Sequence, residues 1–118
     1  HKYHCFLVMV TMETAPDSMM YIENIEQALE YMEEAIRYKI RKIDVCTRYS
    51  ALQYLIILFE SDESQIPKVM DRIFIQYYKL YDKRDFIPKY EYLPVNEHSE
   101  ETNPQNTSDH LNQDIHPV

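Results

Sequence analysis

The sequence predicts an α+β domain with the ferredoxin-like order β-α-β-β-α-β, in which two helices cover one face of an antiparallel sheet. Apolar runs typical of strands alternate with two stretches of helical periodicity in that order. The chain has 118 residues, which is enough for one domain with a modest hydrophobic core. We therefore expect a single domain over residues 1–94.

The first part of this domain is predicted to contain a strand, a helix and a hairpin. Residues 5–12 form a continuous apolar run, which is typical of a strand in the centre of a sheet. Apolar residues recur every three or four positions over residues 22–43, and this spacing predicts an amphipathic helix. Residues 45–49 alternate and predict a strand, residues 50–53 predict a turn, and residues 54–59 predict a second, buried strand.

The rest of the chain is predicted to add a helix, a strand and a tail. Apolar residues at helical spacing predict a helix over residues 66–80. The aromatic segment over residues 86–93 predicts the last strand, and Pro88 places this strand at an edge of the sheet. Residues 95–118 contain five acidic residues, no Lys or Arg and few apolar side chains, so we expect a flexible acidic polar tail.

The composition excludes several classes of function. The chain has no Gly, which Walker A loops, dinucleotide-binding fingerprints and nucleophile elbows all need. Its net charge of −8 argues against a nucleic-acid partner. No apolar run is long enough to span a membrane, and Cys5 and Cys46 lie in strand-like stretches, as buried cysteines of a cytoplasmic protein do. No spacing typical of metal ligands occurs, so we expect neither a metal nor a cofactor.

Residues 41–54 carry a motif with the sequence RKIDVCTRYSALQY, followed by an apolar strand-like run. This motif resembles the GGDEF domain of bacterial diguanylate cyclases, whose hallmark is R-x-x-D-x-x-x-R-Y-G-G-D/E-E-F before a buried strand. The resemblance extends in outline over residues 5–93, because that family has the same order of elements. It implies a bacterial signalling protein in which a sensor or receiver module precedes this domain, as in a response regulator.

The chain departs from the family where the family performs its chemistry. Ser50 and Ala51 occupy the positions of the two glycines, which in the family let the GTP phosphates approach the backbone. Leu52 and Gln53 occupy the positions of the acidic pair that binds metal, and Tyr54 stands at the final aromatic position. Leu cannot bind Mg²⁺, and phosphoryl transfer depends on that metal. The resemblance therefore implies a degenerate domain that is not an enzyme.

Arg41 and Asp44 retain a second motif of the family, the R-x-x-D that forms the inhibitory site for the product, cyclic di-GMP. On this interpretation Arg41 binds a phosphate or a guanine edge, Asp44 accepts hydrogen bonds from guanine, and Arg48 is a neighbour of the site. A second interpretation needs no ligand: Arg41 ends the helix and Asp44 forms the turn before the next strand.

Two functions remain open from the sequence. The first is a catalytically inactive GGDEF-like regulatory domain that senses cyclic di-GMP through Arg41 and Asp44. The alternative is a protein-interaction or dimerisation module that binds no nucleotide. The expected partners are the upstream module of the same polypeptide, cyclic di-GMP and a second copy of the chain.

Overall fold

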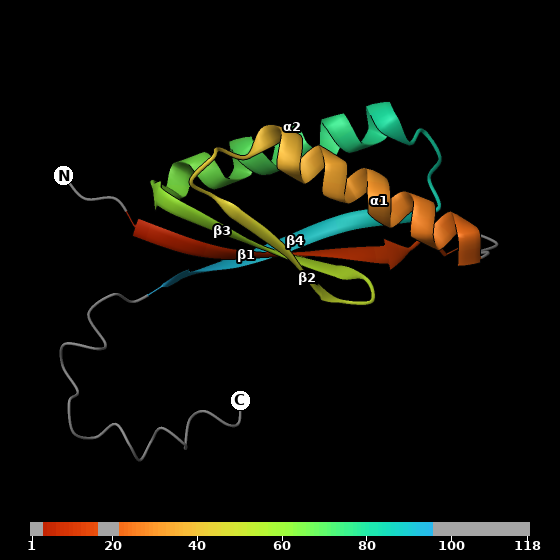
Figure 1. Ribbon diagram of the computed structural model, residues 1–118, viewed down its shortest axis with the longest axis horizontal. Coiled ribbons are helices and arrows are strands. Elements are labelled where there is room, and N and C mark those ends of the chain that lie inside the picture. The colour runs from red at the N-terminus through yellow and green to blue at the C-terminus, as the bar shows by residue number, and fades with distance from the viewer. Residues whose placement is uncertain (1–3, 17–21, 96–118) are drawn as a thin grey trace, which may run out of the picture.

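The computed structural model describes residues 4–16 and 22–95. The expected flexible tail lies outside these residues, except that Val95 ends the last strand. The elements occur in the predicted order (Figure 1). They are β1 (His4–Thr14), α1 (Ile22–Lys39), β2 (Val45–Ser50), β3 (Gln53–Ser61), the short 3-10 helix η1 (Glu63–Gln65), α2 (Ile66–Leu80) and β4 (Phe86–Val95).

The four strands form one sheet with the order β2-β3-β1-β4, and each neighbouring pair is antiparallel. Both helices lie on the same face of this sheet (Figure 1). The structure thus confirms the predicted α+β ferredoxin-like fold. It also confirms that the first strand is central and that the strand containing Pro88 lies at an edge.

The core lies between the sheet and the two helices. In β1 every second residue from Phe6 to Met12 is buried, as expected for a strand with one face against helices. The buried residues of α2 recur at helical spacing: Ile66, Met70, Ile73 and Tyr77. Full burial of one such side chain stabilises the fold by about 1.5–3 kcal/mol. Cys5 and Cys46 are also buried, as the sequence predicted.

Helix α1 ends at Lys39, before the predicted end at residue 43. A turn follows in which the backbone N–H of Asp44 donates to the carbonyl of Arg41 at 3.0 Å. The carboxylate of Asp44 accepts from the backbone N–H of Arg41 at 2.9 Å, and this contact replaces the next helical hydrogen bond. Ile43 consequently leaves the apolar stripe and is 49% exposed.

The β2–β3 hairpin has a shorter turn than predicted. Ala51 and Leu52 alone form the turn, because Ser50 pairs with Gln53 and Gln53 already belongs to β3. Among the described residues only Glu60 has a positive φ, so both turn residues keep negative φ. A hairpin without glycine is possible here because the register shifts at Tyr49, between Arg48 and Ser50.

A β-bulge interrupts the pairing of β3 with β1. His4 pairs with Ser61 but Phe6 pairs with Leu58, so two residues of β3 face Cys5. Glu60 lies in this bulge with φ 47°, a left-handed conformation that favours glycine. The bulge turns the backbone N–H and carbonyl of Phe59 toward the loop that precedes β2.

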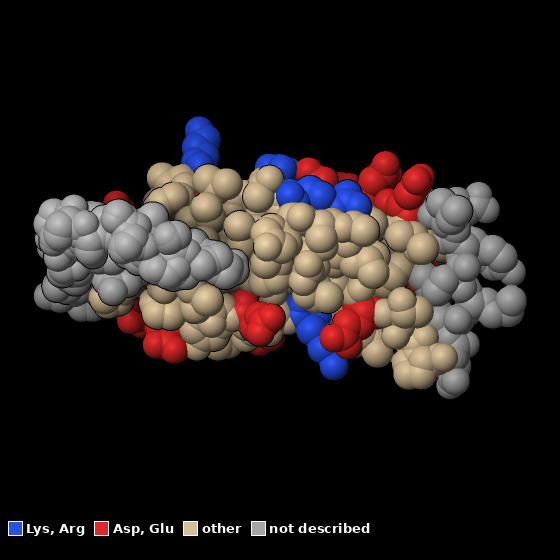
Figure 2. Space-filling model, turned by 90° about the horizontal axis from the view of Figure 1, so that it is seen from below, with Lys and Arg blue, Asp and Glu red and all other residues tan. Residues whose placement is uncertain are grey.

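The face of the sheet opposite the helices carries exposed apolar side chains. Val45, Phe59, Ile87 and Leu93 are 36–55% exposed. Figure 2 shows this face, with uncharged residues over its middle and charged side chains along its long edges. An antiparallel sheet usually presents polar residues on its solvent side, so this face is unusually apolar.

Candidate functional site

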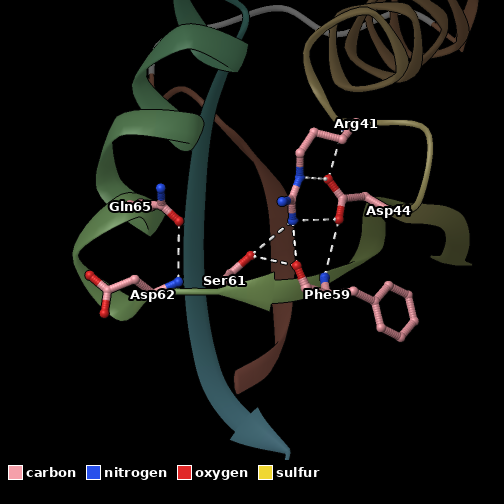
Figure 3. A network of polar contacts seen from close by, with 6 residues as sticks. All are labelled: Arg41, Asp44, Phe59, Ser61, Asp62 and Gln65. Carbon is pink, nitrogen blue, oxygen red and sulfur yellow. Dashed lines mark hydrogen bonds and ion pairs between the residues drawn. The ribbon is translucent and has the colours of Figure 1, made fainter. Parts of the chain in front are cut away.

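Arg41 and Asp44 form a bidentate ion pair (Figure 3). The Nε of Arg41 donates to Oδ2 of Asp44 at 3.0 Å, and Nη2 donates to Oδ1 at 3.0 Å. The side chain of Asp44 is 1% exposed, whereas that of Arg41 is 50% exposed. The hydrogen bond to Asp44 is the main cause that raises the pKa of Arg41. A guanidinium is thus held rigidly at the surface by a buried carboxylate.

The bulge in β3 completes this network. The backbone N–H of Phe59 donates to Oδ1 of Asp44 at 3.1 Å, and Nη2 of Arg41 donates to the carbonyl of Phe59 and to Oγ of Ser61. Asp44 therefore accepts four hydrogen bonds within the chain, which fill its four acceptor sites. This geometry gives Asp44 the role of positioning Arg41 and leaves the carboxylate no free acceptor for a guanine.

Arg41 also lines a cleft of about 190 Å³ between the end of α1, β3 and the start of α2. Lys39, Lys68 and Arg72 contribute three further positive charges to it. Among the lining residues that the structure describes, Asp44 is the only carboxylate, and it is already paired with Arg41. In Figure 3 the second amino group of Arg41 points away from Asp44, to the side of α2. The cleft is therefore strongly basic within an acidic chain.

The sequence pointed to Arg41 but not to the other cations of the cleft. Lys68 and Arg72 are four residues apart and so share one face of α2. Gln65 directly precedes this helix as its N-cap, and its side chain accepts from the backbone N–H of Asp62 at 3.2 Å (Figure 3). The spacing of 68 and 72 was readable in the sequence, but only the topology brings these residues beside Arg41.

Arg48 lies elsewhere. Its guanidinium donates to the carbonyls of Ser50 and Ala51 at 2.8 Å each, and it lies 5.5 Å from the ring centre of Tyr54. The residues from Asp44 to Ser50 span about 20 Å of extended chain, so the hairpin and the cleft lie at opposite ends of β2. Arg48 is not in the lining of the cleft, where the sequence had placed it as a neighbour of Arg41.

The turn of the β2–β3 hairpin is closed by its own contacts. Ser50 donates to the side-chain oxygen of Gln53 at 2.7 Å, and the amide nitrogen of Gln53 donates to Thr11 at 3.1 Å. Leu52 packs against the core, and its carbonyl accepts from Met12 at 2.9 Å. The two positions where the family carries metal-binding acids therefore hold a core contact and a hydrogen-bonded amide.

Tyr54, at the last position of the motif, is a core residue. It is 1% exposed, and burial is the main cause that raises the pKa of its hydroxyl.

Glu13 is the carboxylate nearest the end of β1, and its Oε1 lies 3.3 Å from Nζ of Lys89. Within residues 4–16 and 22–95, no group of three or more His, Cys, Asp or Glu could hold a metal ion.

No protein-family model matches the chain, and no curated protein matches it. Solved structures do resemble it. A DGC protein from Thermotoga maritima superposes with TM-score 0.62 at 14% identity, over 80% of this chain and 66% of that one. The diguanylate cyclase SiaD from Pseudomonas aeruginosa, in complex with its activator SiaC, superposes with TM-score 0.62 at 13% identity, over 86% of this chain. The fold is similar to that of diguanylate cyclases.

At these identities the likeness establishes the fold alone. The chain spans 66% of the Thermotoga maritima protein and 43% of SiaD, both less than two thirds. The activities of those longer proteins are therefore not transferred by the superposition. Within the part of the chain described, no helix is both long and apolar enough to cross a membrane.

Proposed function

We propose that this chain is a catalytically inactive, GGDEF-like regulatory domain that binds cyclic di-GMP at the basic cleft. The observation that carries the proposal is the gathering of four cations around one carboxylate that is already paired with Arg41. Such a cleft suits a phosphodiester, because Arg offers a planar fork to phosphate oxygens and Lys adds a point charge. The R-x-x-D motif adds the resemblance to the product site of diguanylate cyclases.

The size of the cleft sets how the ligand binds. Pockets that enclose a whole drug-sized ligand measure about 300–1,000 Å³. The cleft of about 190 Å³ is smaller, so it would take one phosphate with part of its nucleoside. In this proposal Arg41, Lys68 and Arg72 contact the phosphate, and Asp44 keeps Arg41 in place. The rest of the ligand lies on the surface.

The absence of catalysis belongs to the same proposal. Phosphoryl transfer needs a metal and carboxylates that hold it. Leu52 and Gln53 stand at the acidic positions of the motif, and their contacts with the core and with Thr11 support a structural role for both. Regulation by ligand or partner binding is the remaining use of such a domain.

Titration calorimetry of the full chain with cyclic di-GMP tests the binding site. Removing two charged contacts with Lys68→Ala and Arg72→Ala together should weaken binding by about one to two decades. Both residues are exposed, so the double variant should fold. The matched control is the exposed pair Lys79→Ala and Lys83→Ala, which lie in the last turn of α2 and in the loop after it. Equal affinity in both double variants, or no heat with the wild type, would discard the cleft as the site.

A second candidate function is a protein-interaction or dimerisation module. The exposed apolar residues Val45, Phe59 and Leu93 on the open face of the sheet favour it. The structure of SiaD with its activator offers an example of a similar fold that binds a protein. An upstream sensor or receiver module, or a second copy of the chain, would be the partner. Light scattering of the full chain over a range of concentrations separates a monomer from a dimer.

A further inference from the structure

We propose that the acidic segment after β4, residues 96–118, binds the basic cleft of its own chain. The segment contains five carboxylates and no Lys or Arg: Glu97, Glu100, Glu101, Asp109 and Asp114. The cleft offers the opposite charge on Lys39, Arg41, Lys68 and Arg72. Among the described residues neither Lys68 nor Arg72 takes part in an ion pair, so both charges are available to the segment.

The register of the sheet brings the start of the segment to the correct end of the molecule. Val95 pairs with Cys5, and the neighbouring His4 pairs with Ser61, which lines the cleft. The end of β4 and the end of β3 therefore lie at the same end of the sheet, separated only by β1 (Figure 1). Two strand spacings correspond to about 10 Å.

The first carboxylates of the segment can reach the cleft. An extended chain spans at most about 3.3–3.6 Å per residue, so Glu101 can lie up to about 20 Å from Val95. Another group of described cations, Lys79, Lys83 and Arg84, precedes the first residue of β4. The ten residues of β4 separate it from Val95 by about 33 Å. The cleft is thus the nearer basic surface.

The strength of the contact should come from tethering rather than from any single ion pair. Ion pairs between exposed side chains are individually weak and are screened by salt. A segment joined to the domain is nevertheless present at an effective concentration in the millimolar range. If the proposed function also holds, the segment competes with the anionic ligand for the cleft, but binding of the segment does not depend on that ligand.

Paramagnetic relaxation in the full chain tests this proposal without any nucleotide. A nitroxide is attached to the variant Ser108→Cys, and the native Cys5 and Cys46 are 8% and 7% exposed, so the label goes to position 108. At low salt we expect loss of amide signal over residues 39–44 and 68–72. Raising the salt from about 0.01 to 1 M shortens the Debye length from about 30 to 3 Å and should restore those signals.

Residues near the end of β4 lie close to the label whether or not the segment binds the cleft, so signal loss alone does not decide the question. Charge reversal provides the decisive comparison. The exposed pair Lys68→Glu and Arg72→Glu should recover most of the lost signal, whereas Lys79→Glu and Lys83→Glu should leave the loss unchanged. Equal signal loss in both double variants would overturn the proposal. In a second sample, isotope-labelled chains without a nitroxide are mixed with unlabelled chains that carry it. Signal loss over the same residues in this mixture would also overturn the proposal, because the segment would then bind a second copy.

Discussion

The hydroxyl of Tyr54 on β3 donates a 2.9 Å hydrogen bond to the backbone carbonyl of Leu29 on α1. Tyr54 is 1% exposed, so this bond joins the sheet to the helix inside the core. Tyr77 on α2 is buried as completely, but its hydroxyl has no hydrogen-bond partner among the described residues. Two tyrosines of equal burial thus differ in whether their hydroxyl groups are satisfied.

The first prediction compares the removal of these two hydroxyls. Tyr54→Phe should lower the free energy of unfolding by about 1 kcal/mol, because a buried hydrogen bond is lost. Tyr77→Phe should leave it unchanged or raise it, because an unpaired buried hydroxyl costs free energy. Urea unfolding of the two variants and the wild type measures the difference. A larger loss in Tyr77→Phe than in Tyr54→Phe would contradict it.

The second prediction concerns the ion pair at the cleft. Arg41→Ala removes two charge-assisted hydrogen bonds from a carboxylate whose side chain is 1% exposed. An unsatisfied buried polar group costs about 1–3 kcal/mol, and we expect a destabilisation in that range. Lys42→Ala, at an exposed neighbouring position, is the control and should stay within about 0.5 kcal/mol. Equal stability of the two variants would show that Asp44 finds other partners.

The third prediction concerns the bulge in β3. Glu60 has φ 47°, a conformation that costs a residue with a Cβ about 1–2 kcal/mol. Glu60→Gly should therefore stabilise the fold, by less than this amount because glycine has more conformational freedom when unfolded. Glu60→Val should destabilise it, since a β-branched side chain fits this region worst. Thermal midpoints that follow the opposite order would exclude strain at this position.

The fourth prediction is that the chain makes no cyclic di-GMP from GTP with Mg²⁺ or Mn²⁺. The reason is that Leu52 and Gln53 occupy the acidic positions of the motif and are engaged in internal contacts. Chromatography after incubation with GTP and either metal measures the product. The comparison is a boiled sample of the same protein. Product above that background would show that other residues hold the metal.

The fifth prediction concerns the stability of the domain without its acidic segment. Deleting residues 97–118 should change the thermal midpoint by less than about 4 °C, which corresponds to about 1 kcal/mol for a domain of this size. The segment has few apolar residues, and exposed ion pairs contribute little to stability whether or not the segment binds the cleft. Circular dichroism measures the thermal midpoint of both chains. A larger decrease would mean that apolar contacts hold the segment.

The sequence predicted those features that depend on local pattern. The apolar spacing in α2 and the continuous run in β1 were sufficient for the fold, because each buries one regular face. The apolar spacing alone placed the end of α1 too late, at residue 43, whereas the turn at Arg41 and Asp44 was one of the two interpretations of that motif; the contact of Asp44 with the backbone of Phe59, distant in sequence, was not predictable. The bulge at Glu60 also left no trace, because glutamate has no preference for left-handed φ.

The candidate site was predictable only in part for a related reason. Arg41 and Asp44 were found from their motif, but their mutual hydrogen bonds require a buried carboxylate that no spacing reveals. Lys68 and Arg72 join Arg41 through the packing of α2 over the sheet. Long-range contacts of this kind depend on how the helices pack on the sheet. The sequence predicted only the fold class, which does not specify that packing.

Both outer edges of the sheet are unsuited to pairing with another strand. Along β2 and the turn after it, the carbonyl of Cys46 accepts from Arg37 at 3.1 Å, and those of Ser50 and Ala51 accept from Arg48. Along β4, Pro88 and Pro94 have no N–H to donate. An open, regular edge is the usual template for fibril growth. The exposed apolar face can therefore remain uncovered without the sheet extending from molecule to molecule into cross-β aggregates.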